Sequence, residues 1–270
     1  MKNSKSMSFL EHLAEARVRI LKSLLAVLVF FIPAYAFSER IFVVLMRPIL
    51  DSLPEGSTLI FTHPAEGFTT YLKVSFFTAL AASFPVVLYQ AWQFVAPALY
   101  KKEKRVAVPL VFFGTLFFAL GAGFCYFVAC PPAFEFLLGK YSSEYVRAMP
   151  SIGSALSFLM SLMVGFGLVF EFPVVTFVLA RLGLVNADML KRKRKYALII
   201  SAVAAAVITP TTDALSMMFM LVPIIVFYEL SIGIAWMFGP KKYREKSQEQ
   251  NTNALYESRK ETAAPPKNRK

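Results

Sequence analysis

The sequence predicts an all-α membrane protein that crosses the bilayer six times. Hydrophobic residues occupy 57% of its 270 positions and charged residues only 17%, whereas soluble domains average about 45–50% and about 25%. The apolar residues gather in stretches about as long as a spanning helix requires, roughly 17–25 residues. Clusters of Lys and Arg separate these stretches. This composition excludes a soluble domain, a collagen-like chain and an intrinsically disordered protein.

The six predicted spans belong to one membrane domain, residues 1–240. The first stretch ends at charged residues rather than at a small-residue cleavage site, so we expect it to be retained as a span. Residues 241–270 lack an apolar period and are expected to form a basic disordered tail. The spans lie at about 20–38, 69–96, 106–129, 156–180, 196–211 and 214–238.

Loops and prolines shape the expected bundle. The loops 39–68 and 130–155 hold several prolines, Pro48 and Pro64 among them, with apolar residues between, and predict short interfacial helices that form an outer cap. Only residues 211–213 join the last two spans, which predicts a tight antiparallel hairpin. Prolines within the spans remove backbone donors and favour kinked helices in a concave, curved bundle. Ordinary proline frequency in membrane helices is an equally weighted alternative.

The distribution of Lys and Arg predicts the orientation. If the spans alternate, 23 of the 29 lysines and arginines fall on one side and four on the other. Inside loops carry the excess of positive charge, so both termini are expected in the cytoplasm. Topology and anionic lipids then explain the net charge of +12, and no nucleic-acid partner is expected.

Two carboxylates lie within predicted spans, where an ionised group is costly. Glu171 lies in the fourth span and Glu229 in the sixth, and neither span holds a Lys or Arg to pair with them. Each is interpreted either as a protonated carboxyl bonded to a neighbouring helix or as a site for a substrate or partner. A proton-coupled small-solute carrier would use such acids, but the inverted repeats expected of one are not evident.

Nothing in the sequence predicts a metal or cofactor site. Cys125 and Cys130 lie in or beside one apolar stretch. They lack the spacing of zinc ligands and are interpreted as inert small hydrophobic residues.

Several short motifs occur together in an order that resembles the TatC family, the six-span receptor subunits of the twin-arginine protein translocase. The most specific is FVAPALY at 94–100, followed by KKEKR at 101–105. The resemblance covers about residues 8–238. The other motifs are FLEHLAEAR at 9–17, HPAEGF at 63–68, FEFP at 170–173, and ITP at 208–210 with Asp213.

The resemblance implies a receptor in the bacterial cytoplasmic (inner) membrane, not an enzyme, with no cofactor. It would recognise signal peptides that carry paired arginines on folded cargo. It would assemble with single-span subunits of the TatA and TatB types into a multimeric complex that uses the proton-motive force. The competing predictions are a proton-coupled small-solute carrier and a purely structural scaffold.

The resemblance also implies roles for individual residues. Glu15 and Glu103 would accept the arginines of the signal peptide, with Phe94 bordering the site and Arg17 beside Glu15. Glu171 would face a concave groove in the membrane. The partner contacts would include Thr209, Pro210, Asp213 and Glu229. The outer cap would include Pro48, Pro64 and Glu66.

The sequence departs from the family pattern at two positions. These are Ala16, where Leu is usual, and Met217, where many relatives have Gln.

Paired acids suit paired arginines for a physical reason. A guanidinium presents a planar fork that a carboxylate accepts with two parallel bonds, and a lysine ammonium cannot reproduce this geometry. The basic residues around Glu103 repel a cationic peptide, and salt screens that repulsion beyond about 8 Å. Recognition is therefore expected to be short-range and geometric.

Overall fold

The computed structural model describes residues 9–95, 107–140, 148–208 and 214–239. Apart from one isolated bridge, these residues form helices, turns and connecting segments, so the all-α prediction is confirmed. The chain divides into two compact units, which are described separately. The first comprises Met1–Glu171 and Ala202–Ile224, and the second comprises Phe172–Ser201 and Ile225–Lys270.

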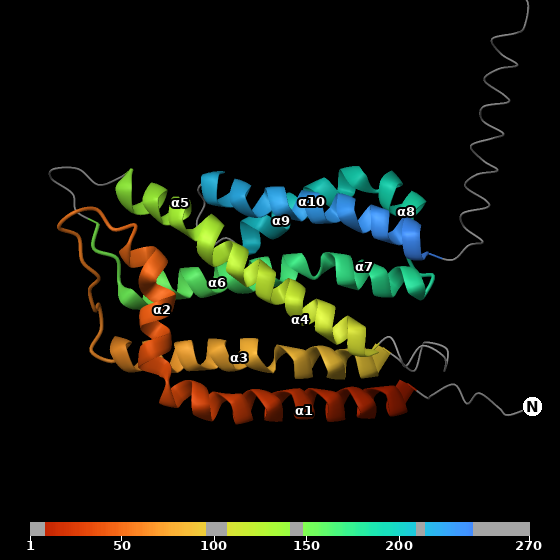
Figure 1. Cartoon of the computed structure of the whole chain (residues 1–270), viewed down its shortest axis with the longest axis horizontal. Coiled ribbons are helices and arrows are strands. Elements are labelled where there is room, and N and C mark those ends of the chain that lie inside the picture. Colours follow the sequence, from red (N-terminus) through yellow and green to blue (C-terminus); the bar gives the residue numbers. More distant parts are fainter. Residues whose placement is uncertain (1–8, 96–106, 141–147, 209–213, 240–270) are drawn as a thin grey trace, which may run out of the picture. The chain divides into compact units, whose positions relative to one another are not determined.

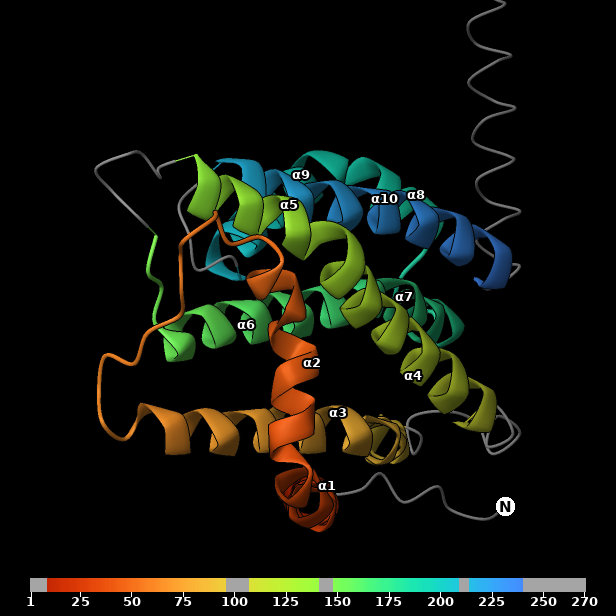
Figure 2. The same ribbon diagram turned by 60° about the vertical axis from the view of Figure 1, so that its left-hand side comes forward.

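The first unit is built on two long helices that lie side by side. Helix α1 (Phe9–Ala36) packs along α3 (Glu66–Val95), and the short α2 (Ser38–Leu50) crosses α3 (Figures 1 and 2). Helix α4 (Ala107–Phe124) packs against both α3 and α6 (Ile152–Phe170). Because α1 and α3 are joined through one reversal of the chain, the first turns of α1 meet the last turns of α3.

Five helical segments are long and apolar enough to cross a membrane among the described residues, which supports a multi-pass membrane protein. The third is longer than predicted, because two π-helical turns and the short α5 (Cys130–Phe134) continue α4 to Gly139. Helix α9 (Arg194–Ile208), at the predicted fifth span, has only 15 residues and is not among the five. These are Glu11–Ala36, Glu66–Phe94, Ala107–Gly139, Ile152–Arg181 and Ser216–Phe238.

Glycines allow α4 and α6 to approach each other closely. A Cβ atom placed on Gly121 of α4 would lie 2.6 Å from the carbonyl oxygen of Phe166 in α6. A Cβ on Gly167 would lie 2.5 Å from the ring of Phe118. Gly121 therefore lies directly against the α6 backbone. A larger residue at this position would push α4 and α6 apart.

The segment before α3 is fixed to the start of α6. Ile60 and Ser151 form a parallel bridge. Glu66 lies in the first turn of α3, and its carboxylate accepts hydrogen bonds from the backbone N–H groups of Thr62 (2.5 Å), His63 (3.3 Å) and Gly153 (2.7 Å). These hydrogen bonds hold two distant stretches of chain together.

The second unit contains α7 (Phe172–Arg181), α8 (Ala187–Arg192) and parts of α9 and α10 (Ala214–Phe238). The Asn186 side chain caps α8 by accepting from Met189 N at 2.7 Å, which satisfies one of the donors left free at a helix start. The Tyr228 hydroxyl donates to the Leu190 carbonyl oxygen at 2.7 Å. The hydrophobic core of the second unit contains Ala180, Ala187, Ile232 and Ala235.

The α6–α7 helix is interrupted at Glu171. The Glu171 N–H bonds to the Leu168 carbonyl, three residues back, at 3.1 Å, and Pro173 supplies no N–H to continue the α-helical pattern.

The predicted tail, residues 241–270, lies outside the described residues.

Candidate functional site

A polar cluster lies where the start of α1 meets the end of α3. Arg19 of α1 is at its centre. One terminal nitrogen, Nη2, donates to Glu15 Oε1 at 3.1 Å, and the other, Nη1, donates to Gln90 Oε1 at 3.2 Å and to Gln93 Oε1. One guanidinium is thus held by a carboxylate and two amide oxygens.

The spacing of these residues explains the cluster. Glu15 and Arg19 are four residues apart in α1, and Gln90 and Gln93 are three apart in α3, so each pair lies on one helix face. Both side chains of the ion pair are partly shielded from solvent, with 18% of Glu15 and 22% of Arg19 exposed. Arg19 Nε is buried and has no hydrogen-bond partner among the described residues.

An aromatic pair lies at the same end of the two helices. The rings of His12 in α1 and Phe94 in α3 stack with their centres 4.3 Å apart and an interplanar angle of 20°. Phe94 therefore lies at the end of α3 that carries Gln90 and Gln93, and the flat His12 ring covers it.

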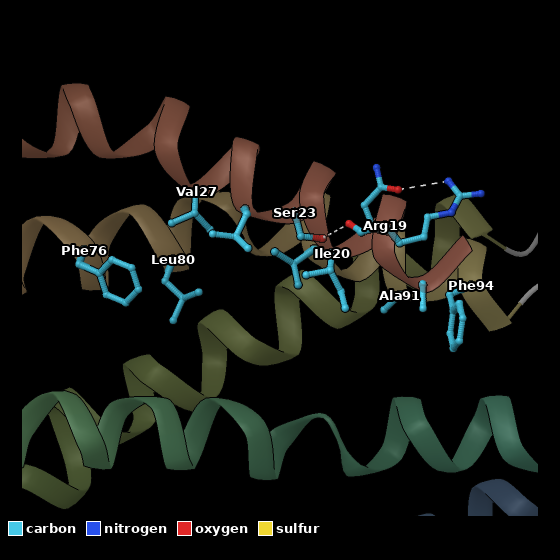
Figure 3. Close-up of a pocket in the computed structure, with 12 residues that line it drawn as sticks. Arg19, Ile20, Ser23, Val27, Phe76, Leu80, Ala91 and Phe94 are labelled. Atoms are coloured by element: carbon cyan, nitrogen blue, oxygen red, sulfur yellow. Dashed lines mark hydrogen bonds between the residues drawn. The ribbon is translucent and has the colours of Figure 1, made fainter. Parts of the chain in front are cut away.

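An apolar groove runs from this cluster along α1 and α3. Its volume is about 480 Å³. Figure 3 shows Arg19 and Phe94 at one end of it and Phe76 at the other. The lining residues are Ala16, Arg19, Ile20, Ser23, Leu24 and Val27 of α1, and Phe76, Leu80, Val87, Gln90, Ala91 and Phe94 of α3.

The structure brings together some of the residues predicted for the site. Glu15 and Phe94 lie at the same end of the α1–α3 pair, where Glu15 pairs with Arg19 and Phe94 stacks on His12. Arg17 is on α1 with an exposed side chain. Glu103 lies outside the described residues.

The two carboxylates predicted within spans have different surroundings. Glu171 is buried, with only 6% of its surface exposed. A Cβ atom placed on Gly114 would lie 3.3 Å from Oε2 of Glu171. The Oε1 atom of Glu171 has no hydrogen-bond partner among the described residues. Glu229 is half exposed and pairs with Arg194 at 2.6 Å. Arg194 lies outside the sixth span, so a search for basic residues within the span missed this partner.

The other predicted residues lie in α2, in the segment before α3 and its first turn, or outside the described residues. Pro48 is buried in α2, and its carbonyl oxygen accepts from the Ser52 hydroxyl at 2.7 Å. Pro64 is exposed, and Glu66 makes the bonds described above. Thr209, Pro210 and Asp213 lie outside the described residues.

Sequence reasoning assigned no binding role to three members of the cluster, Arg19, Gln90 and Gln93, or to the neighbouring His12. Arg19 and Glu15 were recognisable as an i, i+4 pair, but that spacing also describes an ordinary solvated helix face. Gln90 and Gln93 carry no charge and belong to no motif, and His12 lay within a motif without an assigned role. The signal available was the three-residue spacing of the two glutamines close to the end of an apolar span.

Comparison with known proteins identifies the family. The family model described as "TatC: Sec-independent protein translocase protein (TatC)" matches residues 11–223. The chain belongs to the TatC family. A TatC protein from Desulforapulum autotrophicum is 44% identical over 87% of this chain and 86% of its own length. The Escherichia coli K12 TatC is 38% identical over 87% of this chain and 91% of its own length.

Solved structures of TatC agree with this assignment. A crystal structure described as that of the twin arginine translocase receptor TatC matches with a TM-score of 0.74 and 38% sequence identity. The match covers 83% of this chain and 98% of the chain in that crystal structure. A second structure of the receptor, in the detergent DDM, has the same TM-score and 36% identity. TatC proteins are components of a protein transport system rather than enzymes.

Proposed function

We propose that this chain is the signal-peptide receptor of a twin-arginine translocase and that the Glu15 cluster receives an arginine of the signal. The observation that carries the proposal is the bound guanidinium of Arg19, held by a carboxylate and by the amide oxygens of Gln90 and Gln93. A cluster that already holds one guanidinium has suitable acceptors for another.

An entering arginine would compete with Arg19 for Glu15. The resident pair is partly exposed, and such i, i+4 pairs contribute only about 0.3–0.5 kcal/mol, so displacement is inexpensive. The two glutamines can keep the Arg19 guanidinium while Glu15 turns to the ligand. A lysine ammonium lacks the planar fork and would exchange less favourably.

The second acid of the proposed site is Glu103. It follows the last residue of α3, Val95, by eight positions, and the extended reach of the chain is about 3.3–3.6 Å per residue. A connection of eight residues is therefore long enough for Glu103 to act beside the end of the α1–α3 pair that holds Glu15. Two carboxylates there would suit two neighbouring arginines, and Phe94 would border the site with Arg17 beside it.

The wider assembly is proposed from the family. It would lie in the bacterial inner membrane, with six spans in a curved bundle, both termini in the cytoplasm and anionic lipids around its basic loops. Single-span subunits of the TatA and TatB types would complete a complex driven by the proton-motive force. Glu171 would act in the intramembrane groove, and Thr209, Pro210, Asp213 and Glu229 would contact partners.

The decisive test is peptide binding to the purified receptor in nanodiscs. A twin-arginine peptide should bind more tightly than its twin-lysine version. Glu15→Gln should weaken the twin-arginine peptide about ten- to a hundredfold, because a hydrogen bond to a charged group contributes about 1.5–3 kcal/mol. Glu39→Gln, at the exposed start of α2, removes the same charge and should leave binding unchanged. Equal binding of the two peptides would overturn the proposal.

A further inference from the structure

Two buried cysteines bound the first π-helical turn that continues α4, Cys125–Ala129. The side chains of Cys125 and Cys130 have no exposed surface, and their Sγ atoms lie 3.4 Å apart. The Cys130 N–H donates to the Cys125 carbonyl oxygen, five residues back. The turn therefore begins at one cysteine and closes at the other.

The π-helical geometry is what brings the two thiols together. In a regular α-helix, residues five apart point about 140° away from each other around the axis. A hydrogen bond from residue i+5 to residue i instead places the second residue over the first. Single π-helical turns are rare and are often found at functional sites. An uncommon backbone geometry and a contact between two thiols thus coincide at one place.

Neighbouring helices enclose this turn. The rings of Phe124 and of Phe166 in α6 lie with their centres 5.7 Å apart, and the Tyr126 hydroxyl donates to the Val44 carbonyl oxygen in α2. Figure 2 shows α4 running on into α5, which packs against α2. Once these contacts form, the two sulfur atoms are closed off from reagents in solution.

We propose that Cys125 and Cys130 form a disulfide bond across the π-helical turn. Their sulfur atoms have to approach by about 1.4 Å, from 3.4 Å to the bonded distance of about 2.05 Å. This displacement is within the range of ordinary side-chain motion. The bond closes the turn covalently, so that α4 continues into α5 in one fixed way.

The proposed orientation places this end of the segment outside the cytoplasm. The segment Ala107–Gly139 begins next to the basic residues 101–105, which are expected inside, and the cysteines lie in its second half. The bacterial periplasm is an oxidising compartment in which disulfides persist. Buried thiols are inert, so the bond forms while the chain folds, before α2 and α6 cover the turn.

The oxidant is the disulfide of a thiol–disulfide oxidoreductase. The thiolate of one cysteine attacks a sulfur atom of that disulfide, which breaks the S–S bond of the oxidant and leaves a mixed disulfide. The thiolate of the other cysteine then attacks the sulfur of the first and releases the oxidant as a dithiol. The two thiols of this chain lose two protons and two electrons, and the disulfide of the oxidant takes them up.

A metal ion suits the two thiols less well than a disulfide does. Structural zinc takes four ligands. Within the described ranges of the chain, no group of three or more His, Cys, Asp or Glu side chains could hold a metal ion. A metal at these sulfur atoms would therefore lack protein ligands, whereas a disulfide satisfies both thiols without a further group.

The test counts free thiols in protein taken directly from bacterial cells. The cells are lysed in acid, which stops thiol exchange by protonating thiolates. The protein is then unfolded in detergent with N-ethylmaleimide, which blocks free thiols. Reductant and a maleimide that carries polyethylene glycol follow, so each cysteine released from a disulfide gains one large label. The native chain should gain two labels after reduction, none without it, and should migrate as a monomer on a gel without reductant.

A matched variant moves one thiol away from the turn. The double variant Cys130→Ala, Ala133→Cys keeps two buried cysteines in the segment, because Ala133 is only 1% exposed. Positions 125 and 133 are separated by about 12 Å along a helix, which is beyond the reach of a disulfide. N-ethylmaleimide should block both cysteines of this variant, and no label should follow.

Three results would overturn the disulfide. These are blocking of both native cysteines before reduction, a dimer that reductant separates, and labels on the double variant as well as on the native chain. The intact mass of the native chain, lower by two hydrogen atoms before reduction than after it, is a second measurement that needs no variant. Neither measurement involves a signal peptide, so this inference and the proposed receptor function can fail independently.

Discussion

In the free protein the Glu15 carboxylate accepts a hydrogen bond from Arg19, one turn further along α1. Gln90 and Gln93 hold the other terminal nitrogen of the same guanidinium. In the proposed site Arg19 would therefore act as a resident competitor, and an arriving ligand would have to offer Glu15 a better partner. This competition would be a physical source of selectivity at the level of one residue.

Replacing Arg19 should strengthen binding. Arg19→Gln removes the competitor and leaves Glu15 free, so the twin-arginine peptide is expected to bind about twofold more tightly. Isothermal titration calorimetry in detergent would measure this. Arg40→Gln removes the same charge from an exposed position of α2, away from the proposed site, and should not tighten binding. Weaker binding by Arg19→Gln would show that Arg19 positions the site rather than competing for it.

The contacts of Glu66 indicate a structural role in fixing the loop before α3. Its carboxylate joins Thr62, His63 and Gly153, so Glu66→Gln replaces an acceptor that binds several N–H donors with a side chain that can accept at only one atom. We expect the loop before α3 to be cleaved severalfold faster by an added protease. Glu55→Gln, at an exposed position in the same loop, is the control. Equal cleavage of the two variants would contradict this role.

At the scale of elements, the crossing of α4 and α6 depends on the absence of a side chain. Gly121→Ala would force a Cβ to 2.6 Å from the Phe166 carbonyl oxygen. The free energy of unfolding should fall by about 1–3 kcal/mol, the usual cost of overpacking.

Gly123 offers a matched control in the same helix. A Cβ there meets nothing within 4 Å, so Gly123→Ala should be neutral or slightly stabilising. Thermal unfolding in detergent, followed by circular dichroism, compares the two variants. Similar melting temperatures for both would show that the helices adjust at little cost.

Sequence patterns predicted the long elements well because their signal is strong. The apolar stretches that became α1, α3, α6 and α10 each carry enough hydrophobic residues to fix their existence. The extension of α4 to Gly139 was missed, because Pro131 and Pro132 suggest a break. They lie instead in the first turn of α5, where a missing N–H costs little.

The site was only partly predictable for a different reason. Motifs selected Glu15 and Phe94, whose residue types are distinctive. The roles of Arg19, Gln90 and Gln93 depend on α1 and α3 lying side by side, with contacts more than 70 positions apart in sequence. No local pattern contains that information.

For the molecule as a whole, the number of crossings fixes where the ends lie. Six crossings place both termini on the same side, and five place them on opposite sides. In a background without the native cysteines, Ser4→Cys and Ser247→Cys are expected to react with a membrane-impermeant thiol reagent only after the cells are opened. Ser57→Cys, between α2 and α3, should react in intact cells. Reaction of Ser247→Cys but not of Ser4→Cys in intact cells would exclude the six-span topology.

The contact at Gly121 sets a limit on how this protein can move. A side chain can change rotamer to absorb a displacement, but a carbonyl oxygen facing an α-carbon offers no such freedom. Sliding of α4 past α6 would therefore require the two backbones to separate first. Any rearrangement within the first unit is therefore expected to leave this crossing unchanged.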